Sequence, residues 1–589
     1  MKRHLALLLA VLMLVFAFAG CGKDDAVADN PDNTPDSGEN ADNSTGNEPY
    51  GTFRDYFTAI PNTLNVLTST NTSTTTVASL CAVYLYMDRV KADKSGWEWT
   101  LELAAQFPQQ VDEKGLVWEV KIRDDFKWSN GDKITVDDII FTYQQYADPY
   151  QQNLTASTLT QNAYCQIKNI YEYQMGAYPW EEVGVEKIDD YTFRVELEEP
   201  SISLNVQRML NRPLVYQPLY EACMNEDFTA TRYGTSLNTY MCAGQFVLEE
   251  WIPDGKIVLK RNPDYPYQDD IKIEYYTFIQ VPDANTALQL FERGEIDYVD
   301  VPYTNWEAYG EDPRFFEYYG DSLMYAFVNL GNPDQGGVLG NLNYRKALYW
   351  GIDRTEIAKT LGSHPASRLV RRAVVGDPAT GKAFIDFEAD YVPDPTTIYD
   401  VKKANEYLTK AFEECGITYA ETRVLYTDTA THIKGAAEIM QKQYSEAFGN
   451  KMDLVMHIVP AGQSSSLRRW NPDNPNAYDI ALGSLLPSAN DPRSTFTYYR
   501  SDYSPPRFCY NNPEFDAVYE SIMNLHLEED NEAIIEGCQT LEKMILDDLV
   551  IIPLYERPNK VLFNEKVKLP ADGYISGFGF GIRWATIEK

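Results

Sequence analysis

The chain has 589 residues and a formal net charge of -36, with 87 acidic against 51 basic side chains. So acidic a protein repels nucleic acid, and no basic stretch with interleaved aromatic residues offsets the charge, which excludes a nucleic-acid partner. We interpret the acidity as a solvated surface rather than as an acidic binding face. The length is well beyond what one hydrophobic core organises and predicts two or three domains.

The first 20 residues have the pattern of an export signal. Lys2 and Arg3 precede an apolar run over 5–19, which has the length of a signal-peptide core and is short for a membrane span. Gly20-Cys21 closes the run and resembles the lipobox of bacterial lipoproteins, whose cysteine is acylated, although Phe18 stands where that motif usually has leucine. We therefore expect residues 1–20 to be a lipoprotein signal peptide and Cys21 to be lipidated. The alternative is an ordinary signal peptide that happens to precede a cysteine.

Residues 21–49 should form a disordered acidic tether behind the lipidated cysteine. Aspartate, asparagine, proline, serine, threonine, glycine and glutamate dominate this segment, which buries too little apolar surface to offset its ordering entropy. No later stretch is long and apolar enough to cross a bilayer. We therefore expect a body on the extracellular face of the cell membrane, held there by its lipid anchor only, or on the periplasmic side where two membranes are present.

Motifs for catalysis and for metal binding are missing from the sequence. There is no GxSxG, HExxH or phosphate-binding GxGxxG, and the run 376–383 approaches a Walker A loop but ends in Ala383, which lacks the hydroxyl that Mg²⁺ needs. The five histidines lack metal-ligand spacing. The prediction is a protein that is not an enzyme, with no catalytic residue, no metal and no cofactor.

Eight cysteines occur without any CxxC spacing, and setting Cys21 aside for lipid leaves seven. An odd number of that kind does not form a fully paired disulfide set. We expect mostly buried free thiols, with at most one or two bridges among them.

Patterns in the first half of the body predict strands and helices in turn. Residues 117–122 alternate apolar and polar side chains, as a half-buried strand does, and 191–198 repeat the alternation. The Asn-Gly pair at 130–131 is typical of a turn with positive φ. Thr135 and Asp138 have capping-box spacing and predict the start of a helix.

Helix caps and amphipathic runs mark the second half. Residues 345–351 predict a short helix, and Asp353 caps another that Gly362 ends. An Asn-Pro helix start, a second amphipathic helix and a buried strand follow at 512–522, 534–545 and 550–555. Helices and strands mixed over this length predict an α/β protein of several layers.

Five blocks of the chain resemble the bacterial extracellular solute-binding proteins of family 5, the oligopeptide-binding and dipeptide-binding group. The signature stretch runs from Leu101 through the block that begins Ile122-Arg123-Asp124-Asp125 to Asp138. The blocks keep the family's order between about residues 50 and 565, at 101–138, 183–193, 243–265, 293–297 and 345–354.

The resemblance implies a two-lobed periplasmic-binding-protein-like fold of type II with an extra domain in lobe one. The implied divisions are lobe one at 50–83, the extra domain at 84–217, lobe one again at 218–322, lobe two at 323–552 and a last lobe-one part at 553–589. Two crossover strands, near the start and the end of lobe two, would form a hinge. The implied function is that of a monomeric importer receptor, which captures an oligopeptide by hinge closure and delivers it to ABC permease and ATPase subunits unchanged.

Two segments match the family's ligand groove. Thr70, Asn71 and Thr72 lie where lobe one of the peptide binders meets the ligand backbone; a plain polar loop before a helix is the competing interpretation. In lobe two the matching loop follows a strand at 478–482. Its candidate ligand-binding residues are Ser484, Leu485, Leu486, Ser488, Asn490 and Asp491.

The sequence departs from the family pattern at the groove. The aspartate that receives a peptide's ammonium in the peptide binders is Ser488 here, and a hydroxyl cannot balance a buried cation as a carboxylate does. Asp491 could substitute, or it could cap the helix that follows. Aromatic groove residues appear here as Leu485 and as a small residue near Ala461. An oligosaccharide or another small solute, with Trp306 and Trp470 as stacking residues, is therefore the alternative ligand, and a secreted hydrolase is the remote alternative.

Overall fold

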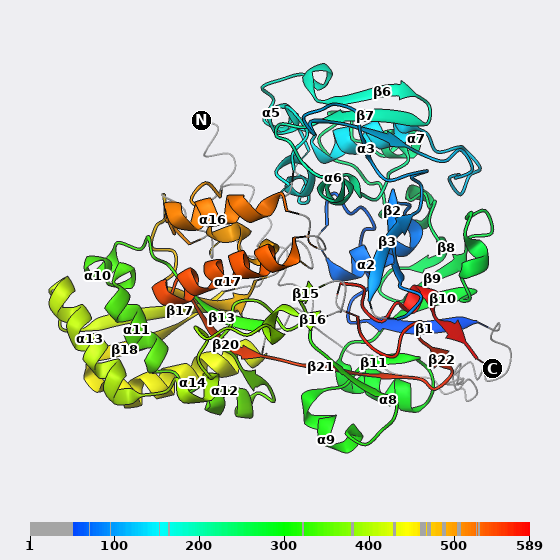
Figure 1. Cartoon of the computed structure of the whole chain (residues 1–589). Helices are drawn as coiled ribbons and strands as arrows, with labels where there is room; N and C mark the ends of the chain where they lie inside the picture. Colours follow the sequence, from blue (N-terminus) through cyan, green and yellow to red (C-terminus); the bar gives the residue numbers. More distant parts are fainter. Residues whose placement is uncertain are drawn as a thin grey trace, which may run out of the picture. The chain divides into compact units, whose positions relative to one another are not determined.

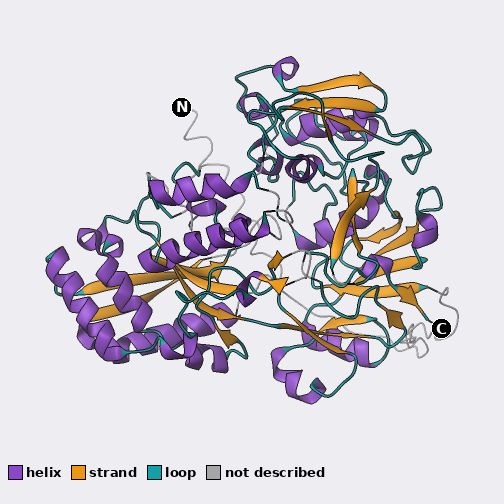
Figure 2. Ribbon diagram, in the orientation of Figure 1, coloured by secondary structure: helices purple, strands orange, loops and turns teal. Residues whose placement is uncertain are grey.

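The computed structural model describes residues 51–69, 71–94, 96–151, 153–162, 165–320, 323–377, 382–427, 431–459, 467, 473–485, 491–503, 508–525, 527, 530–575 and 577–588 (Figure 1). Helices and strands are mixed along the whole of this part of the chain, as the sequence predicts (Figure 2). The predicted signal peptide, Cys21 and the tether lie outside the described residues. No helix in the described ranges has both the length and the apolar character that crossing a bilayer requires.

A four-stranded sheet is formed by segments from two distant parts of the chain. β1 (Thr52–Phe57) pairs in parallel with β10 (Tyr275–Gln280), and β9 (Lys256–Arg261) and β8 (Phe246–Ile252) follow antiparallel. Helix α2 (Thr72–Cys81) contributes to its core, which contains Phe53, Val77, Leu259 and Phe278. Beside this core, α8 (Ala284–Glu292) contacts β11 (Tyr298–Asp300). β11 belongs to a three-stranded sheet in the order β11-β21-β12, with β12 (Phe315–Tyr318) and β21 (Asn559–Phe563).

Between α2 and β8 the chain forms a separate layer of antiparallel strands covered by helices, at the top of Figure 1. Its sheet has the order β4-β5-β7-β6, from β4 (Gln109–Gln110), β5 (Val117–Lys121), β6 (Val185–Asp189) and β7 (Thr192–Glu196). A hairpin of β2 (Tyr86–Val90) and β3 (Trp97–Leu101) precedes it. The helices are α3 (Val136–Tyr146), α4 (Ser157–Thr160), α5 (Ile170–Gln174), α6 (Ser203–Leu210) and α7 (Gln217–Ala222).

The local signals in this layer are confirmed. The Thr135 N–H donates to Asp138 Oδ2 at 2.9 Å in a capping box at the start of α3. Gly131 has a φ of 92° in the predicted turn. The indole N–H of Trp128, in the same turn, donates to the other oxygen of Asp138 at 3.2 Å. The signature stretch therefore closes a turn onto a helix start.

A six-stranded mixed sheet organises the next part of the chain. Its order is β14-β20-β13-β19-β17-β18, with strands β13 (Leu323–Val328), β14 (His364–Pro365), β17 (Ala420–Thr427), β18 (Met452–Val459), β19 (Ile480–Ser484) and β20 (Ile551–Glu556). β13 is buried on both faces: Met324 and Ala326 enter one core and Tyr325 and Phe327 the other. A strand covered on both sides needs an uninterrupted apolar sequence, which β13 has.

Helices cover both faces of this sheet (Figure 2). One face has α11 (Leu342–Trp350), α12 (Arg354–Thr360), α13 (Val401–Cys415) and α14 (Thr431–Phe448), and the other has α16 (Pro513–Met523) and α17 (Asn531–Asp548). The predicted caps are confirmed: Asp353 accepts from the Thr355 N–H at 2.9 Å, and Asn512 caps α16. Gly362, after the end of α12, has a φ of 60°.

The chain passes twice between the three-stranded and the six-stranded sheets. β12 (Phe315–Tyr318) precedes β13, and β20 is followed after two residues by β21 (Asn559–Phe563). β12 pairs with β21 in one sheet, and β13 pairs with β20 in the other, all antiparallel. The strands before and after the two passages are therefore paired with each other in both sheets.

The remaining α-helices and strands of the described ranges are short, and several 3₁₀ turns lie between the elements. These short helices and strands are α9 (Trp306–Tyr309), α10 (Asp334–Gly337), the pair β15 (Val375–Asp377) and β16 (Lys382–Ala383), and the pair β22 (Val567–Lys568) and β23 (Thr586–Ile587). β15 and β16 contain the two ends of the Walker-like run and pair with each other, whereas a phosphate-binding loop leads from a strand into an α-helix.

Candidate functional site

The first predicted groove segment lies at the start of α2. Asn71 is its N-cap residue with an extended backbone, and its carbonyl accepts the Thr75 N–H at 3.0 Å. The side chains of Asn71 and Thr72 are exposed, whereas Thr74 is buried and donates its hydroxyl to the Thr63 carbonyl at 2.8 Å. Thr70 lies outside the described residues. Asn71 and Thr72 are thus available to a ligand, and their role remains a prediction.

The second predicted segment begins where β19 ends. Ser484 is its last residue, half-buried and opposite Met324. Leu485 is only 2% exposed and belongs to the core that contains Tyr325 and Phe496. Its side chain packs into that core, so a ligand contact through Leu485 remains a prediction. Leu486, Ser488, Asn490 and Ala461 lie outside the described residues.

Asp491 is buried and already bound on several sides. Its Oδ1 accepts from the backbone N–H of Arg493 at 3.0 Å, which caps the 3₁₀ turn at Pro492–Thr495. The Arg493 guanidinium forms a bidentate ion pair with Asp491, in which Nε donates to Oδ1 at 3.0 Å and Nη2 donates to Oδ2 at 2.7 Å. Of the two roles that the sequence left open for Asp491, the structure contains the cap.

A second arginine reaches Asp491 from far away in the sequence. Arg208 of α6 donates from Nη1 to Asp491 Oδ2 at 3.2 Å, across 283 positions. The Asp491 side chain is 0% exposed and that of Arg208 only 16%, so water screens this pair little. Burial alone would raise the pKa of Asp491, but the hydrogen bonds and charges of Arg493 and Arg208 hold that pKa below its usual value. Asp491 is therefore an ionised carboxylate between two guanidinium groups.

Arg493 also holds the end of α16. Its Nη1 donates to the carbonyls of Ile522 at 2.9 Å and Leu525 at 2.7 Å. The side chain of Arg493 is 1% exposed. One buried cation thus joins the loop after β19 to a helix on the six-stranded sheet.

Neither arginine was among the residues predicted from the sequence. Arg493 has a local signal, because a charge two residues after an Asp-Pro helix start can reach back to the cap. Arg208 has none, since nothing near it in the sequence distinguishes it from an arginine on a helix surface. The two predicted segments themselves share no hydrogen bond or ion pair among their described residues.

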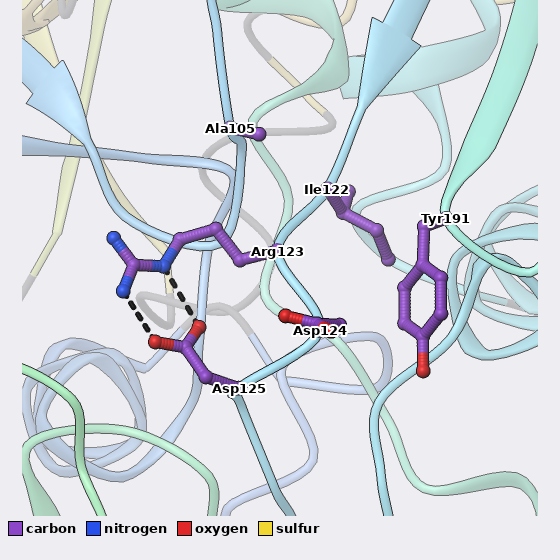
Figure 3. A pocket seen from close by; sticks show the side chains of 6 residues that line it. All are labelled: Ala105, Ile122, Arg123, Asp124, Asp125 and Tyr191. Carbon is purple, nitrogen blue, oxygen red and sulfur yellow. Dashed lines mark hydrogen bonds and ion pairs between the residues drawn. The ribbon is translucent and has the colours of Figure 1, made fainter.

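A pocket of about 410 Å³ opens beside the signature stretch (Figure 3). In it, Arg123 Nε donates to Asp125 Oδ1 at 2.8 Å, and Arg123 Nη1 donates to the hydroxyl of Tyr267 at 2.9 Å. The Asp125 hydrogen bond holds the pKa of Arg123 above its usual value. The guanidinium of Arg123 is thus already paired with Asp125, two residues along the chain. The lining residues are Ala105, Ile122, Arg123, Asp124, Asp125 and Tyr191.

One of the two tryptophans predicted to stack on a sugar, Trp306, has partners within the protein. The indole N–H of Trp306 donates to the Val301 carbonyl at 2.8 Å, and the ammonium of Lys560 lies 4.5 Å from its ring centroid. Trp470 lies outside the described residues. Among the described side chains, no group of three or more histidine, cysteine, aspartate or glutamate residues is arranged to hold a metal ion.

Comparison with known families decides the class of the protein. The family described as bacterial extracellular solute-binding proteins, family 5, matches residues 96–505, which is more than half of the chain. This chain belongs to that family. The family resemblance in the sequence is confirmed.

Curated relatives match most of the chain at low identity. The oligopeptide-binding protein OppA of Bacillus subtilis is 24% identical over 79% of this chain and 82% of its own length. A dipeptide-binding protein of Lactococcus lactis is 23% identical over 81% of this chain and 85% of its own length.

Solved structures share the fold of this family 5 protein. An oligopeptide transporter substrate-binding domain of Bacillus anthracis superposes with a TM-score of 0.70 at 22% identity, covering 92% of this chain and 99% of that one. OppA of Listeria monocytogenes bound to peptide gives a TM-score of 0.69 at 21% identity, with 92% and 100% covered. The predicted fold class, a periplasmic-binding-protein-like α/β fold, is confirmed.

Proposed function

We propose that this chain is the substrate-binding subunit of an ABC importer and that it captures oligopeptides between two lobes for delivery to the permease. The observation that carries the proposal is the set of relatives: proteins described as oligopeptide-binding and dipeptide-binding match 79% and 81% of the chain. A structural neighbour described as bound to peptide has the same fold over 92% of the chain. Function then consists of binding and release, with no chemical step.

The proposed lobes follow the sheets. Lobe one comprises residues 50–83, 218–322 and 553–589 and carries the extra domain at 84–217, and lobe two comprises 323–552. The pairing of β12 with β21 and of β13 with β20 supports this division, because the two connections between the sheets start and end on paired strands. Two connections held side by side at both ends can bend as one unit, which is what hinge closure requires.

The contact between Arg208 and Asp491 belongs, in this proposal, to the closed state. Arg208 is on α6 of the extra domain and Asp491 on the loop after β19 of lobe two, so the 3.2 Å contact needs the two to lie together. A ligand that touches both lobes stabilises the closed state through its higher affinity for that state. The ion pair adds protein–protein stabilisation to the same state.

The state of Asp491 bears on which peptides bind. Between Ser484 and Pro492 the sequence contains one acidic residue, Asp491, and its carboxylate is committed to two arginines. A ligand ammonium placed at this loop would have to compete with both guanidinium groups. We propose that this loop binds the peptide backbone and leaves a free N-terminus without a carboxylate partner here.

Isothermal titration separates these possibilities. The purified body is titrated with a pool of short peptides, with the same pool after N-acetylation, and with a panel of oligosaccharides. We expect saturable heat with both peptide pools at affinities within about tenfold of each other, because the free N-terminus has no carboxylate partner at this loop. A factor of ten in affinity corresponds to roughly 1.4 kcal/mol. A free-N-terminus requirement would show as loss of binding after acetylation and would overturn the proposal for the loop alone.

The glycan titration and two further measurements test the class of function. Saturation by a glycan with no heat from peptides would mean that the ligand is an oligosaccharide, the alternative, and not an oligopeptide. Mass spectrometry should recover bound peptides intact after incubation, and cleavage products would favour a hydrolase. Small-angle scattering should show compaction on saturation, since closure reduces the radius of gyration.

The position in the cell completes the proposal. The family is one of extracellular solute-binding proteins. We propose that lipidated Cys21 and the tether hold a monomeric body beside the permease and ATPase subunits of the importer. Metabolic labelling with an alkyne fatty acid tests the anchor, and a Cys21→Ser variant should lose both the label and the membrane fraction.

A further inference from the structure

Two cysteines lie together at the base of the extra domain. Cys81 is the last residue of α2, and Cys242 comes four residues before β8. In this structure both carry thiols, and they are 0% and 3% exposed. Both belong to the core of the four-stranded sheet, together with Phe53 and Phe246.

Backbone hydrogen bonds fix the two cysteines side by side. The carbonyl of Cys81 accepts the N–H of Ala243 at 2.9 Å and the N–H of Gly244 at 2.8 Å. The approach is so close that a Cβ on Gly244 would lie 2.4 Å from the Ala82 carbonyl oxygen. Ala243, which donates one of these hydrogen bonds to Cys81, is thus the direct chain neighbour of Cys242. The adjoining Cys242 side chain, together with burial, raises the pKa of the Cys81 thiol well above its usual value.

We propose that Cys81 and Cys242 form a disulfide bond in the exported protein. Family 5 proteins are extracellular, and disulfides form and persist in oxidising compartments outside the cytosol. Residues 82–241, which include the whole extra domain, would form the closed loop. The bond would therefore tie together the two chain segments through which the extra domain connects to the four-stranded sheet.

The other cysteines do not offer such a pair. Cys223 and Cys538 are buried, and Cys165, Cys415 and Cys509 are half-buried. The Cys165 sulfur lies 3.7 Å from the Met209 sulfur, which cannot oxidise to a disulfide. Among the described cysteines, a second thiol influences the pKa of Cys81 but not those of the remaining five.

The oxidation is a thiol–disulfide exchange. The two thiols lose two protons and two electrons, one S–S bond forms, and the S–S bond of the oxidant, a protein or small-molecule disulfide, breaks to give two thiols. The thiolate is the reacting form, and in the folded core the pKa of Cys81 is raised and both sulfurs are shielded from solvent. The bond therefore forms during folding after export, before the core closes.

Differential alkylation of the full exported chain tests the proposal. The protein is denatured without reductant, treated with iodoacetamide and digested, and the peptides are identified by mass spectrometry. We expect Cys81 and Cys242 to stay unalkylated and to appear in one linked peptide that separates on reduction. Cys165, Cys223, Cys415, Cys509 and Cys538 serve as internal controls and should be alkylated.

Thermal unfolding provides an independent measurement. Closing a loop of this length in the unfolded chain should raise the melting temperature, and we expect Cys242→Ser to lower it by about 5 °C or more. Reductant should lower the wild-type transition to about the same value and leave that of Cys242→Ser unchanged. Cys223→Ser, also buried, is the matched control and should keep the full response to reductant.

Two outcomes would overturn the proposal. One is alkylation of Cys81 and Cys242 in the exported protein to the same extent as the five control cysteines. The other is a linked peptide that joins one of the two to a different cysteine. If Cys242→Ser fails to fold, the alkylation result on the wild-type chain decides alone.

Discussion

Glu102, in the proposed extra domain, and Asp491, in the proposed lobe two, are both buried carboxyl groups, but their partners differ in charge. Glu102 accepts the Tyr265 hydroxyl at 2.7 Å and the Tyr84 N–H at 3.1 Å, which are neutral donors. Asp491 lies between the guanidinium groups of Arg493 and Arg208. Burial raises the pKa of Glu102 to about 7, whereas the two cations hold that of Asp491 below its usual value in spite of burial.

The difference shows how the two regions use a buried acid. A carboxyl group bonded to neutral donors can be buried as the acid, and folding then favours the protonated form. A carboxylate between guanidinium groups must be buried as the ion, and loss of a partner leaves an uncompensated charge. The stability of the proposed extra domain should therefore depend on pH near neutrality, and the stability of the proposed lobe two should depend on each charge of the ion pair.

The largest effect expected from this comparison is that of Arg493→Met. The variant leaves Asp491 buried with Arg208 alone and removes the donor to the Ile522 and Leu525 carbonyls. Breaking one side of a buried ion pair costs about 3–5 kcal/mol. Urea unfolding should show that loss of stability in the proposed lobe two. Lys434→Met is the control: its pair with Glu438 is exposed and should contribute less than about 0.5 kcal/mol.

The comparison would fail if both variants unfolded at the same urea concentration as the wild-type chain. The Arg493 ion pair would then contribute no more than a surface pair does. A double variant, Arg493→Met with Asp491→Leu, sharpens the test, because removing both charges should restore part of the loss.

The second effect is a pH dependence of the stability of the proposed extra domain. The pKa of Glu102 is about 7 in the folded protein against 4.5 for an exposed glutamate, so the unfolded state loses its proton first as pH rises. The stabilising contribution is complete below the unfolded value and is lost as pH rises through 7. Between pH 5 and 8 the loss should be roughly 2 kcal/mol. Calorimetric melting curves across that range would measure it.

Glu102→Gln keeps the shape and the acceptor but cannot ionise. We expect its stability to match that of the wild-type protein near pH 5 and to exceed it near pH 8. Asp55 also has a raised pKa of about 7, so the variant should flatten the pH profile only in part. A pH profile identical to that of the wild-type chain would mean that Glu102 is ionised when folded, with Arg583 as its counter-charge.

The contrast between local and long-range contacts explains how much of the structure could be predicted from the sequence. The cap of α12 by Asp353 and the capping box of α3 depend on residues within one helical turn, and both were predicted. The resemblance in five blocks gave the fold class because each block keeps local spacing. The Arg208–Asp491 contact joins residues 283 positions apart and has no local pattern, so the fold had to be known first.

The candidate site was predictable only in outline. The loop after β19 could be located, and the two roles of Asp491 could be stated, but the choice between them depended on how Arg493 folds back. Leu485 illustrates the same limit: a leucine after a strand can face a groove or a core, and it packs into the core here. Which of the predicted residues contact a ligand remains a prediction.

The third effect concerns ligand affinity. Arg208→Gln removes the proposed closed-state ion pair and leaves Asp491 paired with Arg493, so the fold around Asp491 should persist. We expect peptide affinity to fall by about 5–30-fold, which corresponds to roughly 1–2 kcal/mol, mainly through faster release. Arg212→Gln is the matched control four residues further on, since Arg212 donates to the Thr158 carbonyl within the proposed extra domain. Equal dissociation rates for the two variants would remove the ion pair from the closing mechanism.

The smallest effect expected is that of Asp353→Asn, which tests whether binding is sensitive to any buried or capping aspartate. Asp353 caps α12 through the Thr355 and Glu356 N–H groups, and asparagine caps helices about as well, so stability should change by less than about 0.5 kcal/mol. Asp491→Asn, by contrast, removes the negative charge between the two arginines and should weaken peptide binding measurably. Titrations of the two variants side by side check this order. If both bind peptide with wild-type affinity, then Asp491 acts only as a cap, as Asp353 does, and the two carboxylates differ in burial but not in function.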